Sequence, residues 1–169
     1  LIKYFSSSGY YIQISTKKKI SHEWLGRIEK SLIKKTQLNI YISLPTLGQA
    51  NDIESKADHV SDRITNFDFC SKEGKIEMYM YVKPFLDNIT IKDIDEYVFL
   101  QNKYKMKTIV GNIFRFDLKE GEQIYVGKNE MYERNSNMRD EFMKRLTQSG
   151  AVYCHSLDPI KDKMKRNNE

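Results

Sequence analysis

Polar or basic residues follow several apolar, strand-like segments of this chain at the point where each segment ends. Lys17 follows the run that closes at Thr16, and Ser43 lies near the end of the next run. Parallel strands place their carboxyl ends at one edge of a sheet, and both barrels and open α/β sheets bind ligands there. We therefore expect a site among the residues at these strand ends, namely Thr16, Lys17, Ser43, Lys83, Asn112, Phe114, Arg115 and His155.

Other kinds of catalytic site find little support in the sequence. His22, His59 and His155 have no second histidine or carboxylate at metal-ligand spacing, and no serine or cysteine nucleophile motif is present. Cys70 and Cys154 are too few and too far apart for a disulfide framework or a zinc site, so we expect buried or half-buried thiols. No glycine-rich phosphate loop follows a strand, which counts against dinucleotide-binding and P-loop folds.

Length, hydropathy and charge limit the class of protein. The chain has 169 residues, enough for one domain with its own core, and a net charge of +5. No apolar run approaches the roughly 18–20 residues of a membrane span, and no signal-peptide pattern opens the chain. We therefore expect a cytoplasmic protein without membrane contact. The run Lys17, Lys18 and Lys19 fits either a solvated surface or a contact to nucleic acid.

Hydrophobic periodicity predicts strands and helices in alternation. Apolar runs predict strands at residues 10–16, 38–44, 75–83, 106–113 and 150–155. Helical spacing predicts helices from the N-cap Ser21 to Ile33, over 53–71, from a second cap at Thr90 to Tyr104, and over 134–148. Gly74 is expected in the left-handed conformation at a helix end. Residues 116–129 favour an excursion or a short hairpin.

The repeated βα units predict an α/β fold, because a crossover helix is needed to start each parallel strand. A (βα) barrel and an open doubly wound sheet both accommodate this order. We expect residues 1–157 to form part of a (βα) partial TIM-type barrel with helices on one outer face, and residues 158–169 to form a frayed polar tail. The strand at 10–16 is so apolar that we expect another segment or chain to cover its edge.

Four of these segments resemble the middle and later strands of radical S-adenosylmethionine enzymes, in the branch around spore photoproduct lyase. They are Ile12-Gln13-Ile14-Ser15-Thr16-Lys17, Ile40-Tyr41-Ile42-Ser43-Leu44, Ile53-Glu54 with Arg63 nine residues on, and Met80-Tyr81-Val82-Lys83-Pro84-Phe85-Leu86. The resemblance covers roughly residues 10–114. It implies a partial barrel that binds S-adenosylmethionine and a [4Fe-4S] cluster and cleaves S-adenosylmethionine reductively to start radical chemistry.

The chain departs from that family in one respect. The family binds its cluster through three cysteines in a loop, and this sequence contains no Cys-x3-Cys-x2-Cys. The resemblance therefore implies cluster ligands outside this chain, on an amino-side barrel segment or a companion chain.

The resemblance also implies roles for individual residues, each of which has a purely structural alternative. Arg63 would bind the carboxylate of S-adenosylmethionine, or would pair with Asp58 or Asp62 on a solvated helix. Ser43 would hydrogen-bond the ribose or the amino acid part, or would satisfy a backbone group before Pro45. The other implied binding residues are Lys17, Lys83, Pro84 and Phe85. Lys17 would lie near the sulfonium and the ribose. Pro84 and Phe85, together with Leu86, would form an apolar shelf under the adenine. Glu54 would cap or orient its own helix.

Three hypotheses about function follow. The first is the carboxyl-side portion or subunit of a radical S-adenosylmethionine enzyme with an unknown substrate. The second is a non-catalytic binding module of barrel descent. The third is a small basic α/β domain that contacts nucleic acid through Lys17, Lys18 and Lys19. The sequence does not decide whether the chain is an enzyme.

Overall fold

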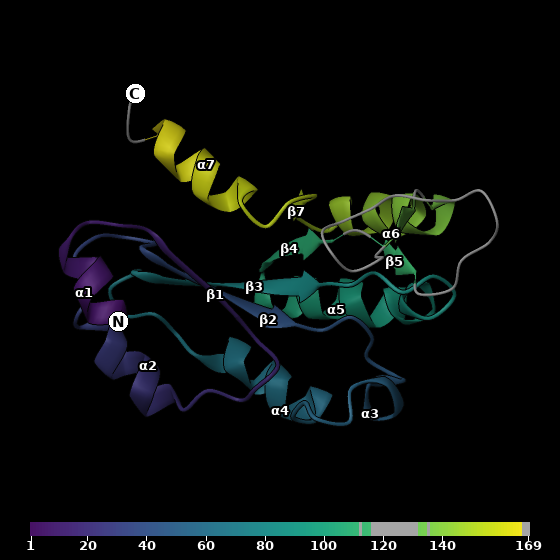
Figure 1. The fold of residues 1–169 in the computed structure, drawn as a ribbon, viewed down its shortest axis with the longest axis horizontal. Coiled ribbons are helices and arrows are strands. Elements are labelled where there is room, and N and C mark those ends of the chain that lie inside the picture. Colours follow the sequence, from purple (N-terminus) through teal and green to yellow (C-terminus); the bar gives the residue numbers. More distant parts are fainter. Residues whose placement is uncertain (112, 116–131, 135, 167–169) are drawn as a thin grey trace.

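A five-stranded parallel sheet organises the protein in a computed structural model that describes residues 1–111, 113–115, 132–134 and 136–166 (Figure 1). The strands are β1 (Ile12–Thr16), β2 (Leu38–Ser43), β3 (Ile76–Val82), β4 (Lys107–Val110) and β7 (Val152–Tyr153). Their order in the sheet is β1-β2-β3-β4-β7, and every neighbouring pair is parallel. The predicted α/β class with parallel βα units is confirmed. Because the order runs along the chain without reversal, it matches part of a barrel better than a doubly wound sheet.

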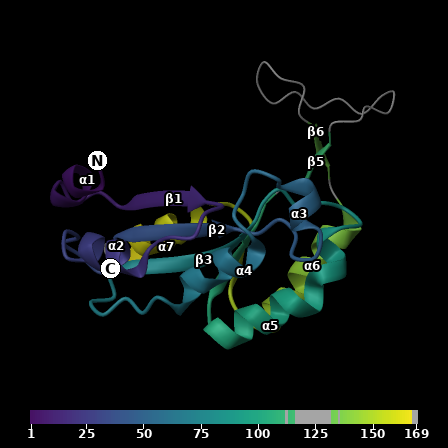
Figure 2. The same ribbon diagram turned by 90° about the horizontal axis from the view of Figure 1, so that it is seen from below.

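Helices connect these strands and cover one face of the sheet (Figure 2). They are α2 (His22–Glu29), α3 (Ala50–Ile53), α4 (Val60–Ile64) with the 3-10 turn η1 (Thr65–Asp68), the 3-10 turn η2 (Thr90–Asp93), α5 (Ile94–Tyr104) and α6 (Asn137–Thr147). Leu25, Tyr97 and Phe142 from these helices share one apolar core with alternate residues of the strands. Burial of this apolar area is the main force that holds the layers together.

The other face of the sheet is polar and aromatic, since side chains alternate along each strand. In β2 every residue is buried, with Ile40 in the helical core and Asn39 and Tyr41 on the opposite face. The register aligns Asn39 with Glu77 and Tyr41 with Tyr79. Helix α7 (Asp158–Arg166) crosses this polar face, where the Lys163 ammonium bonds Asn39 and lies 2.7 Å from Glu77.

Helix α7 corrects two expectations. Residues 158–166 are helical where a frayed tail was predicted, and they cover the face opposite the other helices. The reason is a contact distant in sequence, the pair between Lys163 and Glu77. Helix α1 (Ile2–Ser7) was also not predicted; the Oγ of Ser6 fixes it by donating to the Ser31 carbonyl.

The predicted helix over residues 53–71 is wrong, because α3 ends at Ile53 and only the short helix α4 and the turn η1 lie within that range. Hydrogen bonds to the loop after β1 hold the intervening segment: the Asp58 carboxylate accepts from the backbone N–H of Lys19, and the Asp58 N–H donates to the Lys17 carbonyl. Thr90 is not the predicted cap, since its hydroxyl donates to the Pro45 carbonyl and accepts from the Leu86 N–H.

The structure also tests the predictions for Ser21, Gly74 and the two cysteines. Ser21 is the N-cap of α2, as predicted, and Gly74 has the expected positive φ of 64°, although it closes the turn before β3. Cys70 and Cys154 are exposed, which contradicts their predicted burial. The excursion predicted at 116–129 lies outside the described residues; an antiparallel pair, β5 (Ile113–Arg115) and β6 (Tyr132–Arg134), is described beside it.

Candidate functional site

Three of the predicted site residues converge with Glu54 at the carboxyl ends of β1 and β2. The Arg63 side chain, only 1% exposed, donates from Nη1 to the Ser43 carbonyl at 2.7 Å and to Glu54 Oε2 at 2.8 Å. The Lys17 ammonium lies 2.5 Å from Glu54 Oε1. The break between α3 and α4 creates this arrangement, because it leaves Glu54 at the end of one helix and Arg63 in the other. Glu54 therefore links both basic residues.

Arg63 has a structural role that the sequence did not reveal. Its guanidinium faces the Glu54 carboxylate and a strand-end carbonyl, and its Nε is buried without a hydrogen-bond partner among the described residues. A direct contact between Arg63 and a ligand stays a prediction. Glu54 does not simply orient its own helix, since its carboxylate pairs with Arg63. The nine-residue spacing gave no signal of this pair, because on one continuous helix it places two side chains on opposite faces.

Lys17 is the exposed member of this group, and it borders a cavity of about 310 Å³ that Glu54 and residues 55–57 also line. An ammonium beside a carboxylate is the charge complement of an amino acid group, which carries one charge of each sign. Opposite charges at this distance attract strongly when one of them is buried, as the Glu54 side chain is. The arrangement is suited to a small zwitterionic ligand.

The three lysines of the basic run each lie near a carboxylate. Besides the pair of Lys17 with Glu54, Lys18 lies 2.8 Å from Asp58 and Lys19 lies 3.5 Å from Asp62. Hydrogen bonds from the Lys18 side chain and the Lys19 backbone lower the pKa of Asp58. The run thus ties the loop after β1 to the segment before α4, and a contact with nucleic acid stays a prediction.

The residues at the third predicted strand end, Lys83, Pro84 and Phe85, have different surroundings. The Lys83 carbonyl accepts a long hydrogen bond of 3.4 Å from the Ser43 hydroxyl, and the bond to Pro84 is cis. The Phe85 ring is fully buried in the helical core, 5.3 Å from the ring of Phe142. Of the predicted apolar shelf, only Pro84 and Leu86 are partly exposed.

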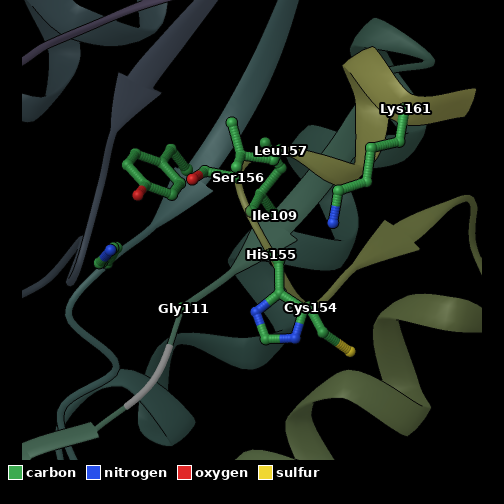
Figure 3. Close-up of a pocket in the computed structure, with 9 residues that line it drawn as sticks. Ile109, Gly111, Cys154, His155, Ser156, Leu157 and Lys161 are labelled. Atoms are coloured by element: carbon green, nitrogen blue, oxygen red, sulfur yellow. The ribbon is translucent and has the colours of Figure 1, made fainter. Parts of the chain in front are cut away.

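A second cavity, of about 420 Å³, opens at the carboxyl ends of β3, β4 and β7 (Figure 3). His155, one of the predicted strand-end residues, lines it together with Lys83. Sequence reasoning missed Tyr81 and Lys161, which also line it. Lys161 gave no signal because it approaches the strand ends only through the docking of α7.

The amino end of the polar face carries a different cluster, centred on Glu77. Its carboxylate lies 2.8 Å from the Lys107 ammonium and 2.7 Å from that of Lys163, and it accepts a hydrogen bond from the Tyr79 hydroxyl. Burial opposes the charge of Glu77, but these three hydrogen bonds outweigh it and lower the pKa to about 2. Glu77 is therefore ionised at neutral pH.

The described residues do not fit an iron–sulfur cluster. Cys70 precedes β3 at the amino end of the sheet, whereas Cys154 follows β7 at the carboxyl end. Within the described ranges, no group of three histidine, cysteine or acidic side chains could hold a metal ion. A cluster of this kind needs three or four closely placed thiolates, so these two cysteines cannot supply it.

Fold and site together define an α/β protein whose parallel sheet has one apolar, helix-covered face and one polar face, with cavities at the carboxyl ends of the strands. No family model matches this chain, and no curated protein or solved structure matches it either. Among the described residues, no helix is both long enough and apolar enough to cross a membrane.

Proposed function

We propose that this chain is the carboxyl-side portion of a radical S-adenosylmethionine barrel and that it binds S-adenosylmethionine at the ends of β1 and β2. The observation that carries the proposal is the convergence of Lys17, Ser43 and Arg63, which the resemblance to that family had selected, around Glu54. Sequential parallel strands with helices on one face support the same assignment.

The amino acid part of S-adenosylmethionine matches the charges of this site. Its carboxylate is the partner for the exposed ammonium of Lys17, and its ammonium group is the partner for the carboxylate of Glu54. Arg63 fixes Glu54 from the buried side and at the same time anchors the carboxyl end of β2 through the Ser43 carbonyl. Arg63 thus acts as a positioning residue in this proposal.

The proposal assigns no cluster ligand to the described part of this chain, because Cys70 and Cys154 do not fit that role. The radical chemistry of the family would then require an amino-side barrel segment or a companion chain that carries the cluster. We place the whole assembly in the cytoplasm.

The lack of a possible set of cluster ligands among the described residues favours one alternative, a non-catalytic binding module of barrel descent. Such a module would keep the cavities at the carboxyl ends of the strands and would have lost reductive cleavage. Binding of S-adenosylmethionine separates the alternatives, since the module need not retain that ligand.

Calorimetric titration of S-adenosylmethionine into the full chain tests the proposal. We expect saturable binding that Lys17→Met weakens at least tenfold, which corresponds to the loss of about 1.4 kcal/mol from one charged contact. Lys19→Met is the matched control, because Lys19 is exposed, pairs with Asp62 and does not line this cavity. Equal affinities for the two variants would remove Lys17 from the site, and a lack of binding by the wild type would favour the binding module.

A further inference from the structure

We propose that the cavity at the carboxyl ends of β3, β4 and β7 is a binding site for an organic phosphate (Figure 3). It extends beyond the proposed function, because phosphate binding here requires no S-adenosylmethionine at β1 and β2. The two cavities share none of the described residues that line them.

The charge of the lining points to an anion. Lys83, His155 and Lys161 contribute basic groups from three different elements, and no carboxylate is present among the described lining residues. Asp158 lies 4.0 Å from the Lys161 ammonium and accepts a hydrogen bond from the His155 backbone N–H. The charged side chains among the described lining residues are therefore basic.

The number of basic groups favours phosphate over a carboxylate ligand. A phosphate monoester carries a charge of about −1.5 to −2 at neutral pH and offers several acceptor oxygens, whereas a carboxylate carries a single charge. The cavity of about 420 Å³ is much larger than a phosphate ion and falls within the usual range for small-molecule sites. Tyr81, Ile109 and Leu157 line it as well, so an organic group has aromatic and aliphatic surface to contact.

Glycine at position 111 is required for one of the basic groups to reach the cavity. A Cβ atom at this position would lie 2.7 Å from Lys83 Cγ and 2.9 Å from Lys83 Cβ, which is closer than real contacts allow. The absence of a side chain at Gly111 therefore lets Lys83 lie across the end of β4. Arg139 fixes this strand end by donating from Nε to the Gly111 carbonyl at 2.8 Å.

The segment that follows β7 is also held in place. The Tyr41 hydroxyl of β2 donates to the Ser156 carbonyl at 2.7 Å, and the Asp158 N–H donates to the His155 carbonyl at 3.1 Å. Figure 3 shows the Lys161 side chain extending from α7 toward the segment that carries His155. Because the backbone that carries His155 is already held in position, less conformational entropy is lost there when a ligand binds.

Calorimetric titration with phenyl phosphate and with inorganic phosphate tests this inference on the full chain. We expect phenyl phosphate to bind more tightly than inorganic phosphate, and Lys161→Met to weaken phenyl phosphate binding at least tenfold. Lys165→Met is the matched control on the same helix, because Lys165 is exposed and does not line the cavity. Gly111→Ala should also weaken binding, by displacing Lys83, and a thermal unfolding curve must show that this variant folds.

Two results would overturn the proposal. One is an equal affinity of the wild type and Lys161→Met for phenyl phosphate, and the other is an equal loss in Lys161→Met and Lys165→Met, which would indicate a general effect of surface charge. Titration of S-adenosylmethionine into Lys161→Met distinguishes the two proposals. If both sites exist, this variant should bind S-adenosylmethionine with the affinity of the wild type.

Discussion

The two ends of the sheet carry similar residues but use them differently. At the amino end, Glu77 lies between Lys107 and Lys163, helix α7 covers it, and the small cavity beside it is lined by charges of both signs. At the carboxyl end, Lys17 borders one cavity and Lys161 another, and both side chains are exposed. Charges that are paired and covered stabilise the fold, whereas exposed charges beside a cavity remain able to bind a ligand. This division matches the rule for βα barrels, in which function lies at the carboxyl ends of the strands.

The largest effect on stability is expected from the deeply buried pair of Arg63 and Glu54 at the carboxyl end. Glu54→Ala leaves the Arg63 guanidinium, which is 1% exposed, without its carboxylate. Removal of one partner from a buried ion pair typically costs about 3–5 kcal/mol, and we expect a loss of this size in urea unfolding. Asp62→Ala, which removes an exposed partner of Lys19, is the control and should change the free energy of unfolding by less than about 1 kcal/mol.

A loss of less than about 1 kcal/mol in Glu54→Ala would contradict this account. It would mean that Arg63 finds another partner, and that the carboxyl end contains no structural pair comparable to the cluster at the amino end.

The next largest effect concerns the pH dependence of the cluster at Glu77. Its pKa of about 2 in the folded protein lies below the ordinary value of 4.5, so the stabilisation is complete above pH 4.5 and is lost as the pH falls toward 2. Between pH 6 and pH 3 we expect wild type to lose about 2 kcal/mol more stability than Glu77→Gln, which cannot titrate there. Unfolding curves of both proteins at the two pH values give this difference. Parallel losses in the two proteins would show that Glu77 is not held by its lysines.

A smaller effect is expected at the contact that docks α7. Lys163→Met removes one of two lysines from Glu77, while Lys107 remains at 2.8 Å. We expect a loss of about 1–2 kcal/mol and no change in the affinity for S-adenosylmethionine, because this pair lies at the opposite end of the strands from Lys17. Lys165→Met serves as the control on the same helix. A large loss of affinity for S-adenosylmethionine in Lys163→Met would contradict the separation of structural charges at the amino end from binding charges at the carboxyl end.

The features that could be predicted from the sequence are those that local patterns determine. Apolar runs located the strands and, through their carboxyl ends, the residues Lys17 and Ser43 of the site. The features that were missed depend on contacts between distant residues. Helix α7 forms where Lys163 meets Glu77, the helix over 53–71 breaks where Asp58 bonds the loop after β1, and Lys161 reaches a cavity only because α7 docks.

Chemical-shift mapping tests most directly whether the carboxyl end is the binding end. Backbone amide signals of the isotope-labelled full chain are followed while S-adenosylmethionine is added. We predict saturable changes at Lys17, Ser43 and Glu54, with the signals of Asn39 and Glu77 unchanged. Changes centred on Asn39 and Glu77, or no saturable change at Lys17, Ser43 and Glu54, would contradict the proposal that the carboxyl end is the binding end.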